Sequence, residues 1–96
     1  MEIIKSLNGD ELTITIKGRL DTVTAPDLEK ELNLDDVKKL IVDLNELDYI
    51  SSAGLRVILN TQKVMNKNGS MVIRNAKPEI MEIFDMTGFS SILTIE

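Results

Sequence analysis

The chain has 96 residues and a formal net charge of −5, and it contains no histidine, cysteine or tryptophan. That length suits one domain with a modest core, so we expect residues 1–96 to form a single domain. Without histidine or cysteine the chain lacks the commonest general base, the commonest metal ligand and any disulfide, and its acidic balance argues against a nucleic-acid surface. These absences favour a protein-binding module over an enzyme, and they predict no cofactor, no metal site and no nucleic-acid partner.

The first twenty residues predict a hairpin. Residues 2–7 can form a short strand, and the Asn-Gly-Asp sequence at 8–10 is a turn signal. Residues 11–17 alternate apolar and polar side chains, as in a half-buried strand, until residues 18–21 break the alternation.

No apolar run in the chain approaches the roughly 18–20 residues that span a membrane, and the first residues do not resemble a signal peptide. We therefore expect a cytosolic (cytoplasmic) protein that does not insert directly into a membrane.

The middle of the chain predicts a helix followed by a buried strand. The helix should begin after Thr24, a plausible N-cap, with Pro26 and Asp27 in its first turn. Residues 39–44 are almost wholly apolar, which is typical of a strand covered on both faces. A central strand of a larger sheet is therefore expected here.

The second half of the chain alternates helices with strands. A second helix should run from the serine pair at 51–52 to about residue 68, and residues 71–74 form another short strand. A third helix begins near Pro78 and ends at Gly88, and residues 91–95 form a final strand. The order is ββαβαβαβ, so the fold class is α/β. It should consist of a mixed sheet with an antiparallel N-terminal hairpin, later strands in parallel, and helices packed on it.

Two adjacent hydroxyls, on Ser51 and Ser52, lie where the exit loop of the central strand becomes the second helix. Outward N–H groups and the helix dipole favour negative charge there, and the small Ala53 and Gly54 should leave the site open to a partner. Either serine could be the N-cap, and if Ser51 is, Ser52 lies in the first helical turn.

A catalytic role for these serines is disfavoured, because no histidine is present to act as their base. A phosphate acceptor suits the position better, since a phosphoserine carries roughly −1.5 to −2 charges and a helix N-terminus tolerates them. Arg56 lies one turn beyond Ser52 and either pairs with that phosphate or stays solvated.

Acidic residues gather between the central strand and the serine pair. The spacing of Asp43, Asn45, Glu46 and Asp48 is faintly similar to that of a calcium loop, but the obligatory glycine and the terminal bidentate glutamate are absent. We interpret the cluster as a solvated loop.

Four segments together resemble the STAS domain, and more narrowly the stand-alone bacterial anti-sigma factor antagonists: GRLDTVTA at 18–25, IVDL at 41–44, YISSAGLRVIL at 49–59 and IFDMTGF at 83–89. The resemblance implies a partner that is both an anti-sigma factor and a serine kinase, and binding to it releases a sigma factor. It also implies that the kinase phosphorylates the serine corresponding to Ser52 and that a phosphoserine phosphatase reverses the modification.

This chain departs from the family pattern at the acceptor site. The switch-type antagonists usually have Asp-Ser-Ser/Thr-Gly, whereas this chain has Ser51-Ser52-Ala53-Gly54, so Ser51 competes with Ser52 as the acceptor.

An alternative function is an accessory subunit of a lipid-transport ATPase, which would dock through the same helix start without a kinase. A third is a scaffold component of a stress-signalling assembly. The expected partner-binding surface consists of Asp21, Thr22, Thr24, Tyr49, Ser51, Ser52, Ala53, Gly54, Leu55 and Arg56.

Overall fold

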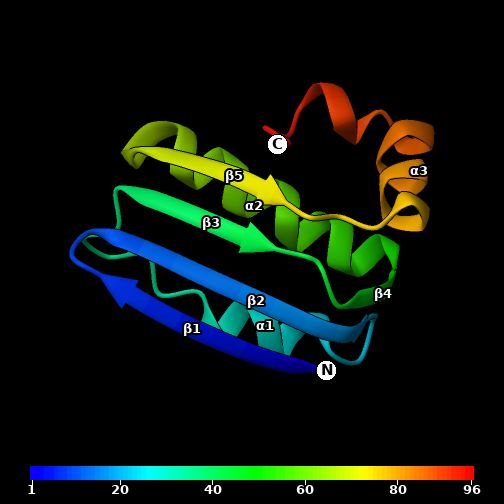
Figure 1. Cartoon of the computed structure of the whole chain (residues 1–96), viewed down its shortest axis with the longest axis horizontal. Helices are drawn as coiled ribbons and strands as arrows, with labels where there is room; N and C mark the ends of the chain where they lie inside the picture. The colour runs from blue at the N-terminus through cyan, green and yellow to red at the C-terminus, as the bar shows by residue number, and fades with distance from the viewer.

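The computed structural model describes residues Met1 to Glu96 as a five-stranded mixed sheet with three helices. The elements, in chain order, are β1 (Glu2–Asn8), β2 (Glu11–Leu20), α1 (Ala25–Glu31), β3 (Lys39–Asp43), β4 (Leu47–Ile50), α2 (Ser52–Asn68), β5 (Ser70–Arg74), α3 (Pro78–Thr87) and a short 3₁₀ turn (Phe89–Ser91). Helices α1 and α2 lie behind the sheet, and α3 lies beyond the carboxyl end of β5 (Figure 1). The α/β class with an N-terminal hairpin is confirmed.

Strand β2 is longer than its sequence pattern predicts. It pairs antiparallel with β1, and its apolar residues at 12, 14 and 16 are buried on the helix-covered face. The alternation then breaks at Gly18, whose φ of +90° favours a glycine, and the register shifts between Gly18 and Arg19. The strand does not end there, because it continues beyond this bulge to the fully buried Leu20.

Two strands follow one another along the second edge of β2. Strand β3 pairs in parallel with the first half of β2, and β4 pairs in parallel with Gly18–Leu20 beyond the bulge. Strand β5 completes the sheet on the far side of β3. The predicted parallel pairing is confirmed. The solvated-loop interpretation is wrong for Asp43 and Asp48, which lie in β3 and β4, although Asn45, Glu46 and Asp48 are exposed.

One core lies between the sheet and the three helices. Leu40 and Val42 of β3 belong to it, together with residues of α2 such as Ile58 and the fully buried Phe84 of α3. Ile41 is also buried, but strand geometry turns it to the opposite face, where neither α1 nor α2 packs (Figure 1). The apolar run correctly predicts a buried strand, although these helices cover one face and not both.

The C-terminal segment is not the strand that its sequence predicts. Helix α3 ends at Gly88, which takes a left-handed conformation with a φ of +81°, and the chain enters the 3₁₀ turn. Backbone pairing joins the last residues to the sheet at a single β-bridge, between Ile73 and Ile95. The buried Gln62 of α2 accepts a hydrogen bond from the backbone N–H of Thr94 at 3.3 Å, so this segment is held from two sides.

Candidate functional site

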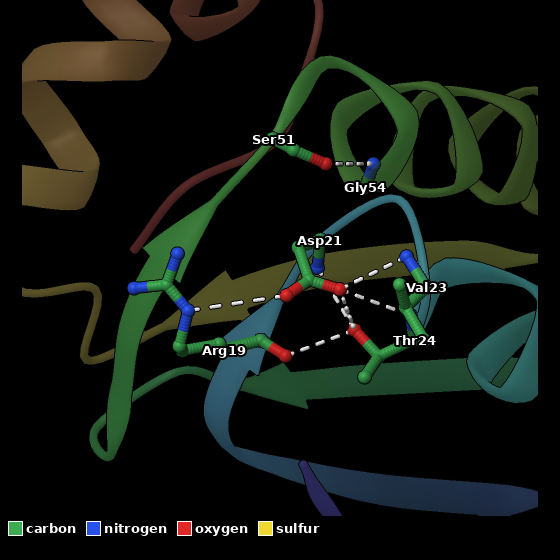
Figure 2. A network of polar contacts seen from close by, with 6 residues as sticks. All are labelled: Arg19, Asp21, Val23, Thr24, Ser51 and Gly54. Carbon is green, nitrogen blue, oxygen red and sulfur yellow. Dashed lines mark hydrogen bonds and ion pairs between the residues drawn. The ribbon is translucent and has the colours of Figure 1, made fainter.

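The carboxyl ends of β2 and β4 meet the start of α2 at one corner of the molecule (Figure 2). The backbone N–H of Ser51 donates to the carbonyl of Leu20 at 2.8 Å, and this bond joins the end of β2 to the start of α2. Carboxyl ends of parallel strands share one edge of a sheet, so loops that are distant in the sequence converge there. Most of the residues expected at the partner-binding surface lie around this corner.

The two adjacent serines have different environments. Ser51 is the N-cap of α2, with an extended backbone (φ −95°, ψ 174°), and its Oγ accepts a hydrogen bond from the N–H of Gly54 at 3.3 Å. Ser52 is the first helical residue, its side chain is exposed, and its hydroxyl makes no hydrogen bond within the chain. Ser51 therefore supplies the cap, and Ser52 carries the free hydroxyl.

Gly54 and Leu55 do not belong to the accessible surface. Leu55 is 6% exposed and packs in the core. Gly54 is also buried, and a Cβ atom placed on it would lie 2.7 Å from Cγ of Leu20 and 3.0 Å from Cγ1 of Ile50. The expectation that Gly54 leaves the site open to a partner is thus wrong, because this glycine lets α2 approach the strand ends closely. Ala53 beside it is half-buried against the core.

The loop from β2 to α1 is fixed by the Asp21 carboxylate (Figure 2). Its Oδ1 accepts hydrogen bonds from the backbone N–H groups of Val23 and Thr24, each at 3.0 Å. The bond from the Thr24 N–H is the main cause that lowers the pKa of Asp21 below its ordinary value, assisted by the Thr24 hydroxyl. Asp21 is therefore charged at neutral pH, and it orders the loop as an acceptor of several donors.

Thr24 holds the N-cap position of α1, but its hydroxyl does not cap that helix. The hydroxyl accepts from the backbone N–H of Asp21 at 2.8 Å, and its one proton lies within reach of two acceptors, the carbonyl of Arg19 at 2.9 Å and Oδ1 of Asp21 at 3.2 Å. The sequence prediction of a capping side chain is wrong here, since the hydroxyl closes the loop instead. Thr22 and Val23, between these two anchors, are exposed, and Val23 is 80% exposed.

Arg19 and Tyr49 stand side by side on β2 and β4. They are register partners in the parallel pair, and the guanidinium carbon of Arg19 lies 4.2 Å from the centroid of the Tyr49 ring. At this distance the cation is attracted to the face of the ring. The Arg19 Nε also lies 3.9 Å from Oδ2 of Asp21. Sequence reasoning did not select Arg19, because its ring partner comes thirty positions later on a strand that the sequence did not reveal.

Arg56, one turn into α2, is a second arginine near this corner. It is exposed and takes part in no hydrogen bond or ion pair within the chain. With Thr22, Ala53 and Glu29 it helps to line a shallow pocket of about 170 Å³ between α1 and α2. It is thus available to an incoming anion.

The acidic residues between β3 and α2 are engaged in structural contacts. Glu46 pairs with Lys17 at 3.1 Å and Asp48 pairs with Lys77, and each pairing raises the pKa of the lysine, chiefly through the hydrogen bond. No group of three carboxylates in the structure is arranged to hold a metal ion. None of the helices is long and apolar enough to cross a membrane.

Comparisons with known proteins identify relatives over almost the whole chain. The sequence model of the STAS domain matches residues 2–96. BtrV of Bordetella bronchiseptica, which is assigned as an anti-sigma factor antagonist, is 38% identical over 88 residues that cover 88% of this chain and 76% of BtrV. The anti-sigma-B factor antagonist of Listeria monocytogenes is 32% identical over 97 residues, covering 97% of this chain and 85% of that protein.

A solved structure shares the fold of this chain. SpoIIAA of Bacillus, solved in its phosphorylated form, aligns with a TM-score of 0.77 and 15% identity, covering 99% of this chain and 91% of SpoIIAA. At that identity the likeness concerns the fold. The match to residues 2–96 and two relatives above 30% identity give the assignment: the chain belongs to the STAS-domain family of anti-sigma factor antagonists, whose members are regulators and not enzymes.

Proposed function

We propose that this protein binds an anti-sigma factor that is also a serine kinase, and that this binding releases a sigma factor. Phosphorylation of Ser52 by the kinase ends the interaction, and a phosphoserine phosphatase restores it. The observation that carries the proposal is the exposed hydroxyl of Ser52 at the first position of α2, beside a serine whose own hydroxyl is used as the cap. Since sigma factors act in the cytoplasm, the proposal includes a cytoplasmic location.

Ser52 is a better acceptor than Ser51 for a steric reason. A kinase must bring the γ-phosphate of ATP in line with the hydroxyl oxygen, and Ser52 presents that oxygen to solvent. Ser51 is a half-buried residue, and its Oγ already accepts a hydrogen bond from the N–H of Gly54. SpoIIAA, which shares this fold, has been solved in a phosphorylated form, and this supports the view that the fold accepts such a modification.

The phosphate should weaken binding without unfolding the domain. It adds roughly −1.5 to −2 charges at a helix N-terminus, where the dipole and the free N–H groups favour them. The adjoining surface carries the exposed apolar side chains of Val23 and Tyr49, which a partner would cover. Enclosing a dianion beside such contacts requires its desolvation, so the cost falls on the complex and not on the free protein.

Phosphorylation can be assigned directly. The protein is incubated with its cognate kinase and ATP, and the modified residue is identified by mass spectrometry. We expect phosphate on Ser52, retention of phosphorylation in Ser51→Ala, and its loss in Ser52→Ala. A phosphate found on Ser51 of the unmutated chain would contradict the proposal.

A charge at position 52 should separate binding from folding. We expect Ser52→Asp to weaken binding to the anti-sigma factor at least tenfold, about 1.4 kcal/mol, while its melting temperature stays close to that of the unmutated protein. Ser6→Asp is a matched control, because Ser6 is exposed on β1 and pairs with the opposite end of β2 from the site. Titration calorimetry measures both variants, and an unchanged affinity of Ser52→Asp would argue against the switch.

A further inference from the structure

We propose that Arg19, held on the face of Tyr49, is an anchoring contact that binds a carboxylate side chain of the anti-sigma factor. The inference rests on the proposed function and adds to it the chemistry of one contact. Arg19 and Tyr49 neither cap α2 nor accept the phosphate, so their contact can be tested separately from the phosphorylation of Ser52.

The guanidinium of Arg19 has one occupied side and one free edge. Its Nε faces Oδ2 of Asp21 at 3.9 Å, and its central carbon lies over the Tyr49 ring. The two terminal nitrogens take part in no hydrogen bond or ion pair within the chain, and Figure 2 shows them directed away from Asp21. The side chain of Arg19 is 63% exposed, so these donors are open to a partner.

The contact is held in place before any partner arrives. Arg19 and Tyr49 are register partners on two paired strands, which fix the spacing of their Cα atoms. The carbonyl of Arg19 accepts a hydrogen bond from the Thr24 hydroxyl, and Asp21 orders the next residues of the loop. Since the side chain and its backbone are both restrained, binding costs less conformational entropy than it would for a free arginine.

The free edge of a guanidinium fits a carboxylate by geometry. Two parallel N–H donors match the two oxygens of a carboxylate, and such bidentate pairs are shorter and stronger than neutral hydrogen bonds. Arginine and tyrosine are also the residue types that most often dominate the binding energy of an interface. The ring beneath Arg19 excludes water from one face of the pair and leaves the donor edge free.

The overall charge of the chain makes this contact specific. With a net charge of −5, the protein attracts partner surfaces that are mainly basic. At this corner Lys77 is already paired with Asp48, and Lys17 is paired with Glu46. A carboxylate on the partner that meets Arg19 would therefore fix the orientation of the complex. A basic surface without such a carboxylate could not make this contact and would bind less specifically.

The test compares binding of the cognate anti-sigma factor to four proteins by titration calorimetry: the unmutated chain, Arg19→Lys, Tyr49→Leu and Arg74→Lys. Arg19→Lys keeps the charge but removes the two parallel N–H donors of the guanidinium, and we expect at least tenfold weaker binding. Tyr49→Leu removes the ring face and should also weaken binding. Arg74→Lys is the matched control, because Arg74 pairs with Glu96 through a single nitrogen at 2.7 Å, and it should bind within about twofold of the unmutated chain.

A double-mutant cycle identifies the carboxylate. Each acidic residue on the surface of the anti-sigma factor is changed to its amide and combined with Arg19→Ala, and we expect one residue whose coupling to Arg19 is at least fivefold. Equal affinities of Arg19→Lys and the unmutated chain, or the absence of any coupled acid, would overturn the inference. So would an effect of Arg19 that appears only after Ser52 is phosphorylated, since the phosphate would then be its ligand. Failure of the unmutated chain to bind would instead refute the proposed function.

Discussion

The close approach of α2 to the strand ends makes Gly54→Ala the most informative stability variant. The added Cβ would lie 2.7 Å from Cγ of Leu20, whereas ordinary carbon contacts are about 3.5–4.0 Å, so the two groups must separate by about 1 Å. Leu20 is fully buried and cannot turn aside. Its carbonyl oxygen would also be 3.0 Å from the new atom while it accepts the bond from Ser51 N–H.

The expected magnitude follows from two opposing terms. Overpacking a well-packed region costs about 1–3 kcal/mol, and replacing glycine by alanine in a helix returns up to about 1 kcal/mol. The gain is smaller than this in the first turn, where fewer intrahelical bonds exist. We therefore expect Gly54→Ala to lower the free energy of unfolding by about 1–2 kcal/mol, which is a fall in melting temperature of roughly 4–16 °C for a domain of this size.

Urea denaturation and thermal melting followed by circular dichroism measure this effect. Asn60→Ala is the matched control, since Asn60 is exposed in the same helix and its replacement should raise the stability by a few tenths of a kcal/mol. A Gly54→Ala protein that melts at or above the temperature of the unmutated chain would show that α2 is not closely packed on Leu20, and the explanation for Gly54 would be wrong.

Two further predictions concern the residues that order the site. Ser51→Ala should lower the free energy of unfolding by about 0.5–1 kcal/mol in urea denaturation because it removes the cap of α2, whereas Ser52→Ala should leave it nearly unchanged; the reverse order would contradict the assigned roles. Asp21 has a lowered pKa in the folded chain, so its stabilising effect is present above its unfolded pKa near 3.9 and is lost as the pH falls through the lower folded value. Asp21→Asn should accordingly melt below the unmutated chain at pH 7, and the gap should shrink at pH 3; a gap that grows on acidification would refute this assignment.

Local patterns in the sequence were sufficient for most of the fold. The apolar alternation of residues 11–17 identifies β2, because a half-buried strand buries every second side chain. The continuous apolar run at 39–44 identifies β3, which is a buried central strand. Glycine at 88 ends α3 as predicted, since the left-handed conformation there suits that residue. The serine pair was also located correctly at the start of α2, with the choice of cap left open.

The errors share a physical cause, which is that tertiary contacts decide those segments. Strand β4 has only four residues, and its buried ends, Leu47 and Ile50, are three positions apart with no alternation between them. Its existence depends on Gly18–Leu20, far earlier in the chain. The sequence predicted a strand at 91–95, but the single β-bridge between Ile73 and Ile95 is the only strand pairing that forms there.

The site was only partly predictable for the same reason. The contact of Arg19 with Tyr49 and the packing of Gly54 on Leu20 each join two segments whose proximity no local pattern encodes. Arg19 was missed altogether, and Gly54 and Leu55 were selected although both are buried. The exposed members of the expected surface, such as Thr22 and Arg56, stay predictions until a partner is tested.

The resemblance to the switch-type antagonists leads us to expect Asp-Ser-Ser/Thr-Gly at this position, and the serine found at 51 has a direct physical interpretation. Aspartate and serine are both good N-caps, so Ser51 can replace the aspartate and still accept the hydrogen bond from the N–H of Gly54. The substitution removes one negative charge from the turn that contains Ser52. A phosphate on Ser52 would then bring this turn to roughly −1.5 to −2 charges, instead of adding to an existing carboxylate. Ser51→Asp restores the acid, so it should keep the cap of α2 and repel a phosphate on Ser52 more strongly. We therefore expect slower phosphorylation of Ser52 in this variant at an unchanged melting temperature, and an equal rate would show that position 51 acts only as the cap.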